Sequence, residues 1–273
     1  MPNIHLAASA GFCFGVARAI DIAKQTSGER KILGDLVHNP LVVQQLAAAG
    51  APVVQSLDMI PAGKVIITAH GIPNAILTAA KSKGLEVVNT TCPLVGTVYY
   101  FAKKFEQEGY HIVVVGNPNH IEVKGIVGNV QSATVVQKPD DVEQLRGRKI
   151  GIVSQTTNEP AYFQEMVQRL KGVASETVFQ DTICFPTKDR QRAAVELAKR
   201  VDAMIIVGGR KSANTKHLHE ICERHTKSYW IEFPEELQTE WFAEAKEIGI
   251  TAGASTPKEL IESTVERIRE LTT

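Results

Sequence analysis

The sequence predicts an α/β fold with parallel sheets, built from three similar lobes. The first observation behind this prediction is alternation. Short apolar runs such as "KVIITAH", "HIVVVGN", "KIGIVSQ" and "AMIIVGG" alternate with amphipathic helical patterns such as "AAVELAKRV" and "ELIESTVERIREL". Apolar strands that alternate with helices are typical of parallel sheets that have helices on both faces.

The second observation is an internal repeat that is aligned on three cysteines. The segments "HLAASAGFC", "LEVVNTTC" and "ETVFQDTIC" are each interpreted as a strand that ends in a cysteine: Cys13, Cys92 and Cys184. The first glycine of the next polar turn follows these cysteines by 21, 24 and 24 residues. A recurring spacing of this kind indicates one structural unit that is used three times.

Each unit then continues in the same order. A helix follows each cysteine, as in "VARAIDIAKQ", "VYYFAKKFEQEG" and "RQRAAVELAKRV". Next comes a strand with a polar turn, in "KILGDLVHNP", "HIVVVGNPNH" and "AMIIVGGRKSANT", and then a further strand and turn in "KVIITAHGIP", "KIGIVSQTTNEP" and "EIGITAGASTP". A proline past each of these last turns can begin the following helix.

The repeat predicts the domain boundaries. We expect lobes at residues 12–92, 93–183 and 184–273. The third unit lacks a last strand, whereas the strand in residues 1–11 has no unit of its own. We therefore expect the N-terminal strand to complete the third lobe, and the three lobes to form a trefoil around a central cavity.

Polar residues recur at the predicted strand ends. Ligands of parallel α/β sheets bind outside the carboxyl ends of the strands. The residues that we expect to converge there, besides the three cysteines, are His38, His70, His120, Thr156, Asn214 and Ser255. Three histidines with hydroxyl and amide groups would form a cradle for an anion such as diphosphate. Glu122 is the carboxylate of this set and could carry a proton.

Three converging thiolates would bind a soft metal, as in a zinc, copper(I) or iron–sulfur site. The cysteines are 79 and 92 residues apart and no C-x-x-C pair is present, unlike in short zinc and ferredoxin motifs. A cubane cluster on three thiolates would keep one iron without a protein ligand. Cys222 shares a helical face with Leu218, Ile221 and His225, so we expect it in the core.

Composition limits the partners. Lys plus Arg equals Asp plus Glu, 30 against 30, so no global field favours nucleic acid or an anionic membrane. No apolar run approaches the ~18 residues of a membrane helix, and we expect no signal peptide. The expected location is the cytoplasm.

The motifs "GFCFGVARAI", "HNP", "AHG", "TTCPLV", "NHIEVKGIVGN", "SQTT", "DTICFPTKDRQ", "KSANT" and "GITAGAST" occur in this order over residues 11 to 257. Together they resemble the 4-hydroxy-3-methylbut-2-enyl diphosphate reductase family of the methylerythritol phosphate route to isoprenoids. The resemblance implies a 4Fe–4S cluster, one per chain, in the centre of a trefoil. It also implies reductive dehydroxylation of an allylic diphosphate to isopentenyl and dimethylallyl diphosphate, with electrons from ferredoxin or flavodoxin.

The resemblance also implies roles for individual residues. The cluster ligands would be Cys13, Cys92 and Cys184. The diphosphate would be held by His38, His70, His120, Ser212, Asn214 and Ser255. Protons would be delivered by Glu122 with Thr156 and Thr187. The positions that depart from the family pattern are Gly96, Ile121, Pro186 and Ala213.

Two alternatives stay open from the residues. One is a hydrolase or acyltransferase with a cysteine nucleophile and a histidine base. The other is a non-catalytic iron–sulfur sensor of a phosphorylated metabolite.

Overall fold

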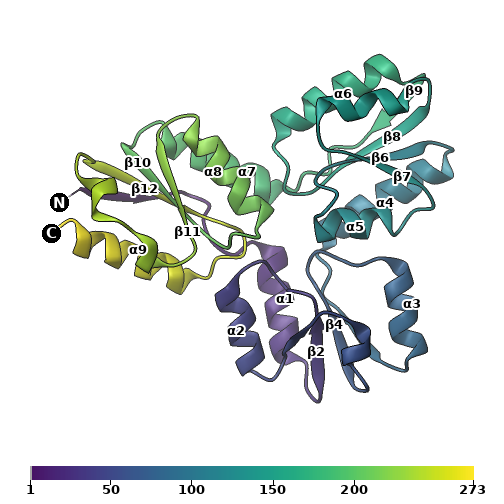
Figure 1. The fold of residues 1–273 in the computed structure, drawn as a ribbon, viewed down its shortest axis with the longest axis horizontal. Coiled ribbons are helices and arrows are strands. Elements are labelled where there is room, and N and C mark those ends of the chain that lie inside the picture. The colour runs from purple at the N-terminus through teal and green to yellow at the C-terminus, as the bar shows by residue number, and fades with distance from the viewer. Residues whose placement is uncertain (1) are drawn as a thin grey trace. The chain divides into compact units, whose positions relative to one another are not determined.

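The computed structural model describes residues 2–273. In this part of the chain, helices flank three four-stranded sheets in which all strand pairs are parallel (Figure 1). The predicted parallel α/β class is confirmed. The chain forms two compact units. The first holds the N-terminal residues up to Ala17, His38–Val42 and Phe185–Thr273, and the second holds Arg18–Val37 and Val43–Cys184.

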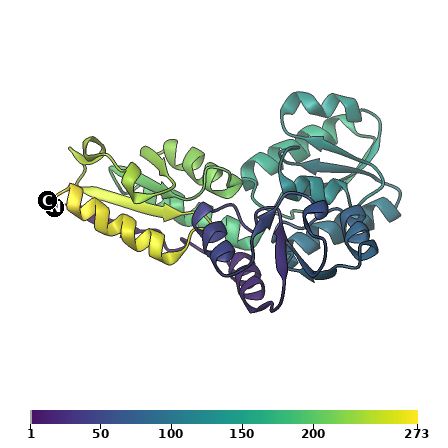
Figure 2. The same cartoon turned by 60° about the horizontal axis from the view of Figure 1, so that its bottom comes forward.

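The first unit contains one sheet, in which the N-terminal strand lies beside a strand from the far end of the chain. Its order is β1 (Asn3–Leu6), β12 (Glu247–Ala252), β10 (Ala203–Val207) and β11 (Lys227–Ile231). The helices of this unit are α7 (Phe185–Ala198), α8 (Ala213–Glu223) and α9 (Lys258–Leu271). Figure 2 shows α9 running along this sheet.

The second unit contains two sheets. One has the order β3 (Val53–Val54), β2 (Arg30–Leu33), β4 (Lys64–Ile67) and β5 (Glu86–Asn89), and the other has the order β7 (Ala133–Val136), β6 (His111–Val115), β8 (Lys149–Ser154) and β9 (Glu176–Phe179). Its helices are α3 (Asn74–Ser82), α4 (Pro93–Gln107), α5 (Ile121–Val127) and α6 (Pro160–Val173). Two further helices, α1 (Phe14–Gln25) and α2 (Pro40–Ala48), begin in the first unit and continue in the second.

Alternation along the central strands builds a core on both faces of a sheet. In β6, Val113 and Val115 pack in a cluster with residues of α6, whereas Ile112 and Val114 pack with residues of α4 and α5. The same division occurs in β10, where Met204 and Ile206 belong with α7 and α8, and Ile205 and Val207 belong with α9. Strands that are buried on both faces must be apolar throughout, which explains the continuous apolar runs.

All three sheets share one strand order. Counting from the first strand of each sheet along the chain, with β1 as the last strand of its sheet, the order in space is second, first, third, fourth. The chain therefore continues from the first strand toward one edge of the sheet and from the third strand toward the other edge. The carboxyl ends of these two adjacent strands form a switch point, which is where α/β proteins bind ligands. The trefoil arrangement and the lobe boundaries at 12–92, 93–183 and 184–273 stay predictions.

Two details differ from the sequence interpretation. The edge strands β3, β7 and β11 were not anticipated, because β3 has only two residues and because β7 and β11 are only partly buried and lack a continuous apolar run. The cysteines also do not end their strands: β1 ends at Leu6, β5 at Asn89 and β9 at Phe179. Each cysteine instead lies directly before the helix that begins at Phe14, Pro93 or Phe185.

Candidate active site

The three cysteine turns make the same backbone hydrogen bond. The N–H of Cys92 donates to the carbonyl of Ala69 at 2.9 Å, that of Cys184 to Thr156 at 3.1 Å and that of Cys13 to Ala254 at 3.1 Å. Each acceptor is the second residue after the third strand of its own sheet. The repeat predicted from cysteine spacing therefore includes the same backbone hydrogen bond in each unit. This bond connects each cysteine to the switch point of its sheet.

A threonine two residues before the cysteine supports two of these turns. The hydroxyl of Thr182 donates to the carbonyl of Ser154 at 2.7 Å and accepts from the N–H of the same residue at 2.8 Å. The hydroxyl of Thr90 donates to the carbonyl of Ile67 in the equivalent place. These side chains take over the strand pairing where the backbone turns away, so they explain the recurring Thr-x-Cys pattern.

The thiol groups of the three predicted ligands are soft donors, which is the type that an iron–sulfur cluster takes. Cys13, Cys92 and Cys184 are partly exposed and none forms a disulfide. Each directly precedes a helix of 12 or more residues, and the N-terminus of a helix stabilises negative charge. Cys222 differs, because it is fully buried in the apolar cluster of α7 and α8 and burial raises the pKa of its thiol to about 12. Its predicted core role is confirmed.

Glu122 is a buried carboxyl group near the N-terminus of α5, only 2% exposed. Its Oε1 accepts the backbone N–H of Thr156 at 2.6 Å, and its Oε2 accepts the Thr156 hydroxyl at 2.7 Å. Burial raises the pKa of Glu122 to about 7, although both hydrogen bonds from Thr156 act to lower it. A carboxyl group with a pKa near neutrality can both give and take a proton under physiological conditions.

Two of the predicted histidines meet in the second unit. The rings of His70 and His120 lie 5.7 Å apart between centroids and stand edge to face at 87°. His120 caps α5, because its Nδ1 accepts the backbone N–H of Glu122 at 3.2 Å. A neutral ring that accepts at Nδ1 carries its proton on Nε2. The capping bond therefore places the proton of a neutral His120 ring on Nε2.

The first unit gathers other predicted residues. The hydroxyl of Ser255 donates to the carbonyl of His38 at 3.2 Å. The turn after β10 also approaches this carbonyl, because a Cβ at Gly209 would lie 3.2 Å from the His38 carbonyl carbon and closer still to its oxygen. The side chain of Asn39 accepts the N–H of Leu41 at 3.0 Å and begins α2. Three predicted turns thus come together around His38.

Asn214 is the clearest candidate for contact with a ligand in the first unit. The side chain is 4% exposed, and neither its amide nitrogen nor its oxygen has a hydrogen-bond partner within residues 2–273. An unsatisfied buried amide costs about 1–3 kcal/mol, so native proteins provide partners for such groups. Ser212, two residues earlier, caps α8 by accepting the N–H of Thr215 at 3.2 Å.

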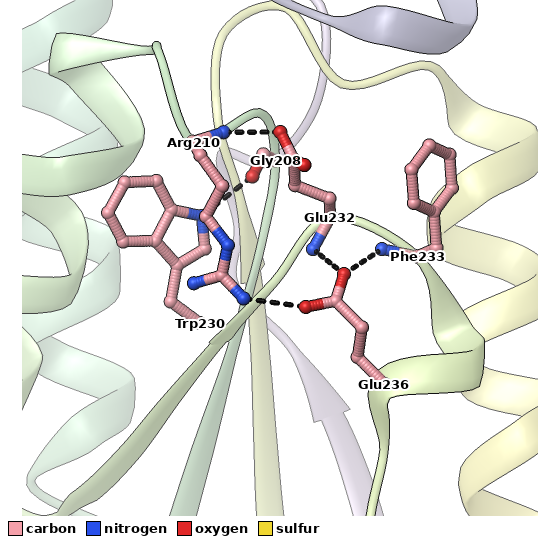
Figure 3. A network of polar contacts seen from close by, with 6 residues as sticks. All are labelled: Gly208, Arg210, Trp230, Glu232, Phe233 and Glu236. Carbon is pink, nitrogen blue, oxygen red and sulfur yellow. Dashed lines mark hydrogen bonds and ion pairs between the residues drawn. The ribbon is translucent and has the colours of Figure 1, made fainter.

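A polar network that the sequence analysis missed holds the turn before Ser212 (Figure 3). The indole N–H of Trp230 donates to the carbonyl of Gly208 at 2.6 Å, and the guanidinium of Arg210 lies 5.1 Å from the Trp230 ring. Arg210 also donates to Glu236 at 2.6 Å through its side chain and to Glu232 at 2.5 Å through its backbone N–H. These contacts fix the backbone that leads into α8.

The carboxylate of Glu236 is the centre of this network. It accepts the backbone N–H groups of Glu232 and Phe233 at 2.7 and 2.9 Å, besides the guanidinium of Arg210. Burial acts to raise the pKa of Glu236, but the two N–H groups and Arg210 outweigh it and lower the pKa. Glu236 therefore stays charged near neutral pH. No signal in the sequence connects it with Arg210, which lies 26 residues away.

The remaining predicted residues have defined places. Thr187 is 2% exposed and lies in the first turn of α7, and the neighbouring buried Arg190 donates to the carbonyl of Gly11 at 2.7 Å. Within residues 2–273, no group of three His, Cys, Asp or Glu side chains is placed to hold a single metal ion. The described helices include none long and apolar enough to cross a membrane.

Comparisons with known proteins identify the same family that the sequence motifs resemble. Residues 4–269 match the family described as LytB protein. A curated relative from Dehalococcoides mccartyi (strain CBDB1), named 4-hydroxy-3-methylbut-2-enyl diphosphate reductase, is 43% identical and is aligned over 95% of both chains. A relative of the same name from Aquifex aeolicus is 40% identical over 99% of this chain and 97% of its own.

Solved structures that resemble this chain have names of the same kind as the curated relatives. The E-1-hydroxy-2-methyl-but-2-enyl-4-diphosphate reductase from Plasmodium falciparum matches with a TM-score of 0.91 and 29% identity, over 97% of this chain and 87% of its own. A second structure is described as (E)-4-hydroxy-3-methyl-but-2-enyl diphosphate reductase, the terminal enzyme of the non-mevalonate pathway. It matches with a TM-score of 0.71 and 38% identity, over 99% of this chain and 100% of its own.

Proposed function

This chain belongs to the LytB protein family of 4-hydroxy-3-methylbut-2-enyl diphosphate reductases, and we propose that it converts this allylic diphosphate to isopentenyl and dimethylallyl diphosphate. In the proposed reaction the bond between carbon and the hydroxyl oxygen breaks, and the hydroxyl takes a proton and leaves as water. Two electrons enter the carbon chain and a second proton is added to carbon. The position of that proton decides between the two products.

The proposed cofactor is one 4Fe–4S cluster per chain, with Cys13, Cys92 and Cys184 as ligands. The observation that carries this proposal is the hydrogen bond that is repeated at all three cysteine turns. Such a cluster, when bound, supplies electrons and a Lewis-acidic iron that has no protein ligand. We propose a ferredoxin or flavodoxin of the cytoplasm as the electron donor.

The chain's own residues would hold the diphosphate and move protons. The proposed diphosphate ligands are His38, His70, His120, Ser212, Asn214 and Ser255. The Nε2–H of His120 and the buried amide of Asn214 support this assignment, because an anion can accept hydrogen bonds from both groups. Glu122 would give its proton to the leaving hydroxyl, with Thr156 holding both carboxyl oxygens. Thr187 is proposed to assist Glu122 in delivering the proton.

The test begins with protein that is reconstituted anaerobically and analysed for iron and sulfide. We expect about four iron and four sulfide per chain and turnover of the allylic diphosphate with a strong reductant. Cys13→Ser, Cys92→Ser and Cys184→Ser should each lower the iron content and abolish turnover. Cys222→Ser is the matched control and should keep both. Wild-type protein without iron, or full activity in any of the first three variants, would contradict the proposal.

A further inference from the structure

Tyr99 of α4 has a buried hydroxyl that the proposed reaction does not use. Its ring is partly buried and packs on the apolar cluster that includes Val123 and Ile126 of α5. The hydroxyl oxygen is inaccessible to solvent. Within residues 2–273, the backbone N–H of Ile72 approaches it and acts to lower its pKa, but without the geometry of a full hydrogen bond. Burial, and then the charge of Glu122, raise the pKa of Tyr99, so the phenol stays neutral. A buried polar group with so little compensation needs another reason for its presence.

The hydroxyl occupies a slot that two glycines form. A Cβ at Gly71 would lie 2.9 Å from the Cζ of Tyr99, and a Cβ at Gly125 would lie 3.5 Å from the same atom. Both hypothetical Cβ atoms would overlap the hydroxyl oxygen, which lies nearer than Cζ in each case. Gly71 also has φ of +79°, which disfavours a side chain in any case, whereas Gly125 is an ordinary helical position. At Gly125, therefore, the Tyr99 hydroxyl is what limits the side chain.

The two sides of the slot carry proposed active-site residues. Gly71 directly follows His70, and Gly125 lies three residues after Glu122 in the helix that His120 caps. Asn129 also joins the two sides, because its buried amide donates to the carbonyls of Ile72 at 2.9 Å and Gly125 at 2.7 Å. The Asn129 amide thus joins the turn and the helix that also contact Tyr99.

We propose that Tyr99 is a positioning residue, whose hydroxyl sets the separation between the 70–72 turn and α5 and thereby the placement of the Glu122 carboxyl group. This inference rests on the proposed function. Without the hydroxyl, α5 can move toward the turn into the vacated space. A displacement of this kind is small, but proton transfer depends steeply on distance.

The packing is tested by thermal unfolding of the full chain in a double-mutant cycle. Gly125→Ala should lower the unfolding midpoint by roughly 3 °C or more, because the new methyl group overlaps the hydroxyl. In the Tyr99→Phe background the same substitution should be neutral or raise the midpoint, because the methyl group then fills the space that the hydroxyl leaves. Equal effects of Gly125→Ala in both backgrounds would overturn the inference, because the sites would then be independent.

The positioning role is tested by kinetics of the reconstituted enzyme. Tyr99→Phe should lower kcat about tenfold and leave KM within about twofold, because other residues hold the diphosphate. The double variant Tyr99→Phe/Gly125→Ala should recover most of the lost kcat, a recovery that a merely structural role would not produce. Tyr100→Phe is the matched control, because its neighbouring ring is 62% exposed.

The possible failures can be told apart. Wild-type kcat in Tyr99→Phe, or no recovery in the double variant, overturns this inference alone. A wild-type enzyme that contains the cluster but does not turn over the allylic diphosphate overturns the proposed function, and this inference with it.

Discussion

One residue, Thr156, satisfies both oxygens of the buried Glu122 carboxylate, with its backbone N–H at 2.6 Å from Oε1 and its hydroxyl at 2.7 Å from Oε2. The carbonyl of the same threonine accepts the N–H of Cys184. The proposed proton donor and one proposed cluster ligand are therefore fixed by a single turn after β8. This arrangement leads to the first two predictions.

Glu122→Gln should keep the iron content and the affinity for the diphosphate but slow dehydroxylation by about 100-fold or more. The amide is isosteric, and the Thr156 hydroxyl can rotate to accept from it, so we expect the turn to keep its structure. Iron analysis, product binding and single-turnover rates check this. Glu165→Gln on the exposed face of α6 is the control. Wild-type rates in Glu122→Gln would remove Glu122 from the mechanism.

The raised pKa of Glu122 predicts a pH dependence of stability. Folding favours the protonated carboxyl group, so the stabilisation from this group is complete below its ordinary pKa of 4.5 and is lost as the pH rises through about 7. The loss amounts to about 3 kcal/mol. Urea unfolding of wild type and Glu122→Gln between pH 4.5 and 8 measures it, and the variant should lack this contribution. Parallel pH profiles for the two proteins would contradict the prediction.

Asn214→Leu should separate stability from binding. The buried amide has no partner within the described residues, so an apolar residue of similar volume should leave the free energy of unfolding unchanged or raise it by up to about 1 kcal/mol. The KM for the diphosphate should rise about tenfold or more, because a donor to the anion is lost. Unfolding and steady-state kinetics on the same preparations check both parts. A variant that is less stable and binds normally would show that the amide serves the fold.

Glu236→Gln should loosen the turn that leads to Ser212. The substitution removes the charge that holds Arg210 and weakens the bonds from the N–H groups of Glu232 and Phe233. We expect the free energy of unfolding to fall by about 1 kcal/mol, since the ion pair is partly exposed, and the KM for the diphosphate to rise a few-fold. Glu143→Gln, which breaks an exposed pair with Arg146, should change neither KM nor stability measurably.

Much of the fold could be predicted because its signals are local or periodic. Apolar runs marked the central strands, and the cysteine spacing marked the repeat and the spare strand that now pairs with β12. The short edge strand β3, only two residues long, could not be found in this way. The strand ends were also placed too late, because the backbone turns at Thr90 and Thr182 are made by side-chain hydrogen bonds to a neighbouring strand.

The sequence by itself determined the family, the parallel α/β class and the residue types available for chemistry, because these depend on composition, order and spacing along the chain. Only the tertiary structure decided how those residues are held. The bonds from Thr156 to Glu122, the slot for Tyr99 and the pairing of Arg210 with Glu236 each join segments that are 26 or more residues apart. Such contacts depend on the directions of side chains after the sheets have formed, and no local pattern encodes those directions.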